Sequence, residues 1–192
     1  MVVIAAIPFL IKKYFMACDF ITKGKRAVAC LNSVGGVKNL YFAQFADYGM
    51  TAASQELSSI GSLDEVFKYE VTGTGAGVTE TFTPSADNFT SFISQALNAT
   101  FAGINAETQN ELQLLLKSRT LVFAEDYNGN IKLMGLENGV WGSGGTAVYG
   151  SAKGDLNGYT IEFVAEEKEY APLLTSSAKT ALSAAVVNSY ID

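Results

Sequence analysis

The stretch Asp155–Ala165, DLNGYTIEFVA, decides the fold class of this chain. Its first four residues combine Asp, Asn and Gly, which favour a tight turn. Apolar and polar residues then alternate, which is typical of a β-strand with one buried face. The side chains expected on that buried face are Tyr159, Ile161, Phe163 and Ala165.

The rest of the chain continues the β pattern. Glycine-rich turns separate short apolar runs, and the 12 Phe and nine Tyr residues favour strands. Asn128-Gly129 is a strong hairpin signal, because a tight hairpin turn needs positive φ at both central residues. We also expect a hairpin in which GTGAG, 73–77, joins the second strand to the third. The predicted strands are 37–48, 65–72, 78–83, 89–102, 119–125, 131–136, 146–152 and 159–165.

Two segments favour helix instead. Asn105–Ser118 begins with a good N-cap residue, has Glu107 near its start and Lys117 near its end, and carries a leucine stripe. The Ala-rich segment Ser176–Tyr190 predicts a second helix, with a strand at Val186-Val187 as the alternative. The long loop 47–63 is expected to contain at most one helical turn, near 54–58. The fold class predicted is therefore mainly β: a β-sandwich or barrel with one flanking α-helix and a C-terminal helix.

The length of 192 residues suits one domain with a sizeable core. We divide the chain into an apolar N-terminal extension, 1–15, a β-rich domain, 16–172, and an Ala-rich C-terminal segment, 173–192. The apolar run Val2–Ile11 is too short to span a membrane, and its lysines follow it, contrary to a signal peptide. Three interpretations remain: an arm that inserts into a neighbouring subunit, a weak membrane anchor, or a true start at Met16. We favour the last and expect no membrane anchor.

The composition excludes several classes of function. With a net charge of −6, the chain repels phosphate backbones, which argues against general nucleic-acid binding. The same charge suits a conduit through which DNA slides without sticking. No histidine is present, so the common catalytic triads are ruled out and zinc is disfavoured. The pair Cys18 and Cys30 is interpreted as two free thiols.

Two further motifs suggest chemistry but have simpler interpretations. GTGAG, 73–77, lacks the spacing of a nucleotide-binding loop, and we interpret it as a turn. Glu125-Asp126, beside Asn128 and Asn130, resembles an ion site or an acid–base pair, but Asp and Asn are also common at hairpin turns. We predict no enzyme activity, no cofactor and no metal.

Trp141 lies in a glycine-rich stretch, 137–145, and has two competing interpretations. Aromatic side chains dominate binding hot spots, so Trp141 is a candidate interface anchor. Alternatively, it plugs the end of a barrel.

Several stretches, taken in order, resemble the structural proteins of tailed phages, and the tail-tube type in particular. The resemblance covers roughly Met16–Pro172. The stretches that show it are residues 20–25, 32–38, 68–71, 91–101, 125–130, 135–139 and 154–160.

The resemblance implies a virion subunit of the phage tail, assembled in the host cytoplasm. Its copies would join into hexameric rings that stack into a tube, contact other tail proteins, and let DNA pass without specific binding. Strands 66–71 and 93–101 would face the ring interface, and loop 47–63 would reach the next ring. The interface candidates are Trp141, Phe67, Tyr69, Ile93, Leu97 and Phe101. The alternative function is a capsid decoration module or a receptor- or carbohydrate-binding β-sandwich.

Overall fold

A computed structural model describes residues 23–27, 31–71 and 75–187 of the chain. Its contacts divide the chain into two units, 1–32 and 33–192. In the first unit, the described residues, 23–27 and 31–32, are exposed and form no helix or strand. The predictions about the N-terminal extension and about Cys18 and Cys30 lie outside the described residues.

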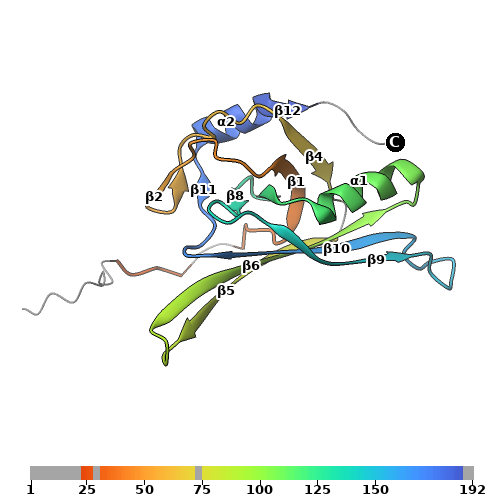
Figure 1. The fold of residues 1–192 in the computed structure, drawn as a ribbon, viewed down its shortest axis with the longest axis horizontal. Coiled ribbons are helices and arrows are strands. Elements are labelled where there is room, and N and C mark those ends of the chain that lie inside the picture. The colour runs from red at the N-terminus through yellow and green to blue at the C-terminus, as the bar shows by residue number, and fades with distance from the viewer. Residues whose placement is uncertain (1–22, 28–30, 72–74, 188–192) are drawn as a thin grey trace, which may run out of the picture. The chain divides into compact units, whose positions relative to one another are not determined.

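The second unit is a sandwich of two β-sheets (Figure 1). Sheet A has the strand order β12-β4-β1-β7-β8-β11-β3-β2. Its strands are β1 (Val37–Gln44), β2 (Ala52–Ala53), β3 (Glu56–Leu57), β4 (Val66–Glu70), β7 (Thr120–Asp126), β8 (Ile131–Met134), β11 (Leu173–Leu174) and β12 (Val186–Val187).

Sheet B is antiparallel and has the order β5-β6-β10-β9. Its strands are β5 (Ala76–Ser85), β6 (Thr90–Ala102), β9 (Trp141–Val148) and β10 (Gly158–Glu167). The two helices are α1 (Ala106–Lys117) and α2 (Ser176–Ala185). The predicted fold class, a mainly β sandwich with a flanking helix, is confirmed.

The first core fills the space between the two sheets. From β10 it takes the alternating side chains that the opening stretch predicts to be buried, and all four are at most 6% exposed. From sheet A it takes Leu40, Phe42 and Val122. The Phe42 and Phe163 rings lie 5.5 Å apart across the sandwich. Alternation in a single strand therefore identified the inner face of sheet B.

The second core lies between sheet A and helix α2. It uses the side chains of opposite parity on the central strands, including Tyr41, Phe123 and Leu133. Ala178 and Leu182 of α2 pack onto them. Because both faces of β1 and β7 are covered, these strands have nearly continuous apolar sequences.

Helix α1 begins as its sequence predicts. The Asn105 side chain accepts a hydrogen bond from the backbone N–H of Thr108, at 2.6 Å. The helix packs against β9, where Gly142 and Gly145 face Leu116. A Cβ atom at Gly142 would lie 2.7 Å from the backbone oxygen of Leu116. The glycines of β9 therefore make room for the helix.

Three local predictions are wrong. Strand β4 does not form a hairpin with β5: it pairs with β1 and β12 in sheet A, while β5 pairs with β6 in sheet B. The glycine-rich stretch around Trp141 is not a loop, because β9 begins at that residue. The segment 47–63 is not all loop, and no helical turn forms near 54–58. Ser54 and Gln55 adopt positive φ instead and connect the small β2–β3 hairpin.

The C-terminal segment is part of the same compact unit as far as it is described, to residue 187. Strand β11 joins β8 to β3, and β12 pairs in parallel with β4. Both alternatives for this segment occur in succession, because α2 ends at Ala185 and a two-residue strand follows. None of the helices in the described part is long and apolar enough to cross a membrane.

Candidate assembly surfaces

A broad groove of about 1120 Å³ opens at one end of the sandwich. Helix α1 forms one wall and strands β1 and β4 form the other, with the C-terminal end of β6 between them. Its apolar lining includes Phe45, Phe67, Phe101, Leu114 and Leu115. Phe67 and Leu114 are 42% and 52% exposed, so the groove presents apolar surface that the described chain leaves uncovered.

The floor and rim of the groove are held by aromatic contacts. Tyr69 makes edge-on contacts with Phe42 and Phe101, at ring distances of 5.2 and 5.7 Å. At the rim, the Arg119 guanidinium lies 4.0 Å from the centre of the Phe45 ring. Its Nε also donates to the backbone oxygen of Asn138. Because these contacts hold the side chains in place within one subunit, the groove has its shape before any partner binds.

The six predicted interface residues fall into three environments. Phe67, Tyr69 and Phe101 line the groove, although only Phe67 is largely exposed. Ile93 and Leu97 point into the subunit interior and are 2% and 1% exposed, so they belong to its core. Loop 47–63 likewise buries its apolar side chains, Leu57, Ile60 and Leu63, in the second core.

Trp141 lies at the start of β9, on the outward face of sheet B. It pairs with Val164, whose neighbours Phe163 and Ala165 point into the core. Trp141 is 39% exposed. It does not plug the end of a barrel, because it stands on an open sheet face at an edge strand.

The strands that form the outward face of sheet B carry no cation. None of the four strands contains Lys or Arg. Two exposed carboxylates, Glu162 and Glu166, point outward. Small side chains surround them, including Thr79, Thr81, Ser94, Ala96, Asn98, Thr100, Thr146 and Thr160. Such a face binds phosphate poorly, since it offers neither positive charge nor a cavity.

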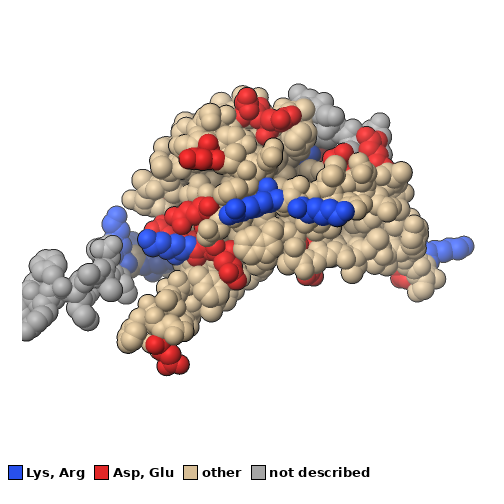
Figure 2. All heavy atoms as spheres, viewed as in Figure 1, with Lys and Arg blue, Asp and Glu red and all other residues tan. Residues whose placement is uncertain are grey.

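An aromatic arm extends from sheet B. We define the arm as Thr81–Phe92, the distal part of the β5–β6 hairpin; from residue 83 to residue 92 it projects beyond β10, which pairs with β6 as far as Ile93 (Figure 1). Phe89, Phe82 and Phe92 are 96%, 52% and 38% exposed. Asp87 is the arm's only charged residue, and Figure 2 shows the projecting end as nearly uncharged with acidic atoms near its tip. The amino-acid pattern of this segment did not predict an exposed surface.

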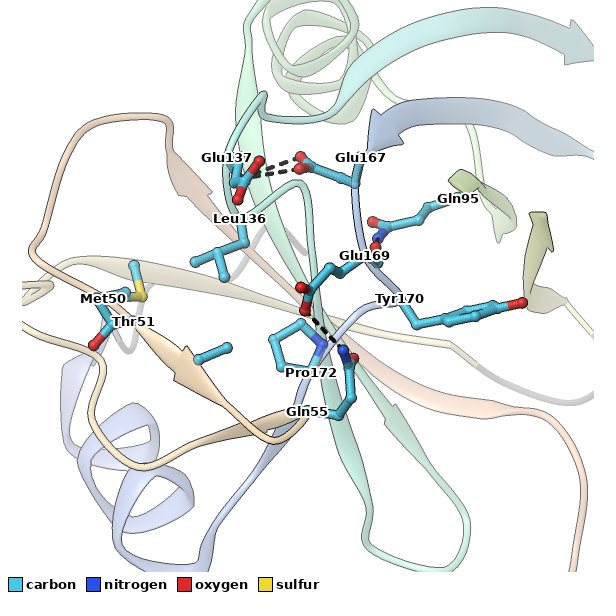
Figure 3. Close-up of a pocket in the computed structure, with 11 residues that line it drawn as sticks. Met50, Thr51, Gln55, Gln95, Leu136, Glu137, Glu167, Glu169, Tyr170 and Pro172 are labelled. Atoms are coloured by element: carbon cyan, nitrogen blue, oxygen red, sulfur yellow. Dashed lines mark hydrogen bonds between the residues drawn. The ribbon is translucent and has the colours of Figure 1, made fainter. Parts of the chain in front are cut away.

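A smaller pocket of about 270 Å³ lies where sheet B meets the turn between β8 and β9 (Figure 3). Three carboxylates line it, from Glu137, Glu167 and Glu169. The Glu167 carboxylate accepts the backbone N–H of Asn138, at 2.8 Å, and that of Glu137, at 3.3 Å. Glu169 accepts from the Gln55 side chain, at 2.8 Å. Because protein donors already engage these two groups, the pocket is a structural junction.

Burial raises the pKa of Glu167, because loss of solvent disfavours its charged form. The N–H donors from Asn138 and Glu137 lower this pKa, but by less. The folded protein therefore holds this proton more tightly than the unfolded chain does. The free energy of unfolding therefore falls as Glu167 becomes charged, while the pH rises from its ordinary pKa of 4.5 through its raised pKa in the folded protein.

We predict that Glu167→Gln removes this pH-dependent loss. The glutamine oxygen can still accept an N–H, but it carries no charge. The free energy of unfolding of the wild type minus that of the variant should fall between about pH 4 and pH 7. The fall is about 1.4 kcal/mol for each unit that separates the folded and unfolded pKa values. Urea unfolding at several pH values measures it, and a difference that rises with pH would contradict the assignment.

The acidic pair at the β7–β8 hairpin is also engaged by protein groups. Glu125 accepts from the side chains of Asn39 and Tyr41, both at 2.7 Å. Asp126 accepts from the backbone and side chains of Asn128 and Asn130. Within the described ranges, no group of three or more Cys, Asp or Glu side chains is placed to hold a metal ion. Asp126 thus organises the predicted hairpin turn.

Comparison with known proteins returned no match of this chain to a family model, a curated protein or a solved structure. The class of protein is therefore defined by the fold itself: a mainly β sandwich with a groove, an arm and a cation-free outer sheet.

Proposed function

We propose that this protein is a structural subunit of a phage-type virion. In this proposal it is a tail-tube protein whose copies form stacked, hexameric rings around a DNA conduit. The observation that carries the proposal is the outward face of sheet B. That face carries two exposed carboxylates among mostly small uncharged side chains, with Trp141 at the start of its edge strand β9, and its four strands contain no Lys or Arg.

The absence of cations on this face suits the wall of a DNA conduit. A channel wall that bound phosphates would hold DNA in place, whereas a wall without cations makes no attractive phosphate contacts. Strands β5 and β9 end sheet B on either side within the described chain. Unpaired strand edges are a ready template for pairing with another chain. Sheets joined edge to edge would form a closed wall with the small, acidic face toward the lumen.

Electron microscopy of the purified protein tests assembly. We expect rings or tubes with a central channel at high protein concentration. A protein that sediments strictly as a monomer at every concentration would contradict the proposal.

Thiol labelling tests which face lines the channel. In a background with Cys18→Ser and Cys30→Ser, Thr160→Cys places a thiol on the outward face of sheet B, and Ser183→Cys places one on exposed α2. Assembly should slow the reaction of the first with a bulky polymer-linked maleimide at least ~10-fold and leave the second reactive. Equal protection of both thiols, or protection of the α2 site alone, would place sheet B elsewhere.

A binding module remains the second candidate, and the exposure of Trp141 favours it. Aromatic rings at a surface provide stacking platforms for sugars and anchors for protein partners. The variant Trp141→Ala separates the candidates. Loss of glycan binding with assembly intact would support the module and count against the tube.

A further inference from the structure

The arm and the groove lie at opposite ends of one strand. Strand β6 begins at Thr90, directly after the arm's tip, and ends at Phe101 and Ala102, which line the groove. Its 13 residues span roughly 40 Å at about 3.3 Å per residue. A single subunit therefore cannot place its own arm in its own groove.

Both surfaces are apolar and are uncovered in the described chain. The arm exposes Phe89 at its tip, beyond the last β6–β10 residue pair, and Phe82 beside that pair, opposite buried Ile93. The groove exposes Phe67 and Leu114 between a helix and a sheet. Large uncovered apolar surfaces on a soluble chain mark interaction sites. One contact between the two surfaces would cover both.

We propose that the arm of one copy inserts its phenylalanines into the groove of the next copy, between α1 and β4. The occupant of the groove is thus a second copy of this chain, joined head to tail. The proposal rests on the self-assembly in the proposed function, and it does not require that the assembly conducts DNA.

The sizes of the two surfaces support this occupant. The exposed parts of the arm's three phenylalanines amount to about 370 Å², taking roughly 200 Å² for each aromatic side chain. A groove of about 1120 Å³ has room for several such rings. A stable interface buries roughly 800 Å² on each partner. The arm's phenylalanines alone supply a little under half of that area, so the arm–groove contact would add to the edge-to-edge pairing of sheet B and not replace it.

The chemistry of the arm also suits insertion. Only Asp87 is charged among its residues, so few charges lose water when the arm is buried. A head-to-tail contact of this kind joins two different surfaces, and repeating it closes a ring or extends a filament. Each copy would therefore contact one neighbour through its arm and the other through its groove, so the assembly would have a direction.

A disulfide test uses the full chain with Cys18→Ser and Cys30→Ser. The pair Phe89→Cys and Leu114→Cys places one thiol at the arm's tip and one in the groove. Because a disulfide needs Cα atoms within about 7 Å, these two cannot bridge within a subunit. Mild oxidation should give a ladder of covalent multimers on a non-reducing denaturing gel. The control pair Phe89→Cys and Ser183→Cys, with its second thiol on α2, should remain mostly monomeric.

A second measurement removes the contact without touching the core. Phe82→Ser with Phe89→Ser should raise the concentration needed for assembly at least ~10-fold. Circular dichroism should stay unchanged, because both side chains are exposed. Tyr149→Ser is the matched control, since this aromatic residue is 77% exposed on a different loop. It should assemble like the wild type.

The outcomes separate this inference from the proposed function. The arm–groove contact would be overturned if rings or tubes form but the 89–114 disulfide does not. It would also be overturned if the arm variants assemble like the wild type. Either result would leave the proposed tube intact. A wild type that never assembles would overturn both. A disulfide between Ile7→Cys and Leu114→Cys, in place of the arm pair, would show that the N-terminal segment fills the groove and would also overturn the inference.

Discussion

A chain shortened to end at Pro172 is expected not to fold. The shortening removes β11, which joins β8 to β3, and helix α2, which covers one face of sheet A. Leu174 and Leu182 are 5% and 1% exposed, and each buried leucine contributes about 1.5–3 kcal/mol. Added to the exposure of the sheet beneath them, this loss approaches the whole stability of a typical domain, about 5–15 kcal/mol. Solubility and circular dichroism of the shortened protein measure the effect.

Two controls locate the effect in the packed helix. A chain ending at Val187 keeps every described C-terminal element and should fold like the full chain. Within α2, Leu182→Ala should cost about 2–5 kcal/mol of unfolding free energy, because it leaves a cavity. The exposed neighbour Ser183→Ala should change stability by less than about 0.5 kcal/mol. A stable, cooperatively folded chain ending at Pro172 would refute the assignment of this segment to the core.

Reversing the charge of the outward face of sheet B is expected to make the assembled protein retain DNA. Glu162→Lys with Glu166→Lys places two cations per subunit on a face that now has none. In a closed ring these cations repeat around the lumen, and phosphate contacts add steeply to affinity. We expect double-stranded DNA to associate about 100-fold more tightly than with the wild type at low salt, and to be released as salt rises.

The matched control makes the same change in net charge on a different surface. Glu56→Lys with Asp64→Lys alters two exposed carboxylates outside sheet B. These lysines should raise DNA association much less, since they do not line the proposed channel. A filter-binding or co-sedimentation assay over a salt series compares the two variants. Equal DNA affinity for both would mean that only net charge matters and would remove the support for a lumen at sheet B.

The sequence predicted most elements whose determinants are local. The N-cap at Asn105 placed the start of α1 within one residue, and Asn128-Gly129 identified the β7–β8 hairpin. The alternation after Gly158 identified both β10 and its buried face. In each case, neighbouring residues carry the physical cause: a side chain that satisfies a backbone N–H, a positive φ, or a repeated apolar position.

The candidate surfaces were only partly predictable. The predicted interface residues Phe67, Tyr69 and Phe101 do line the groove. Ile93 and Leu97, predicted from the same strand positions, lie in the core. The arm was not recognised, although Phe82, Phe89 and Phe92 are close in sequence. Nothing in their spacing shows that the rest of the fold leaves them exposed.

The sequence by itself determined the fold class, the local turns and the charge of sheet B, because these depend on composition and on neighbours along the chain. Only the tertiary structure decided which strands pair. Strand β4 joins β1 and β12 instead of the nearby β5, and the glycines of β9 form a strand because α1 packs against them. Pairing depends on contacts between distant segments, whose energies no local pattern records. For the same reason, the groove between α1 and β4 and the arm at the far end of β6 became visible only in three dimensions.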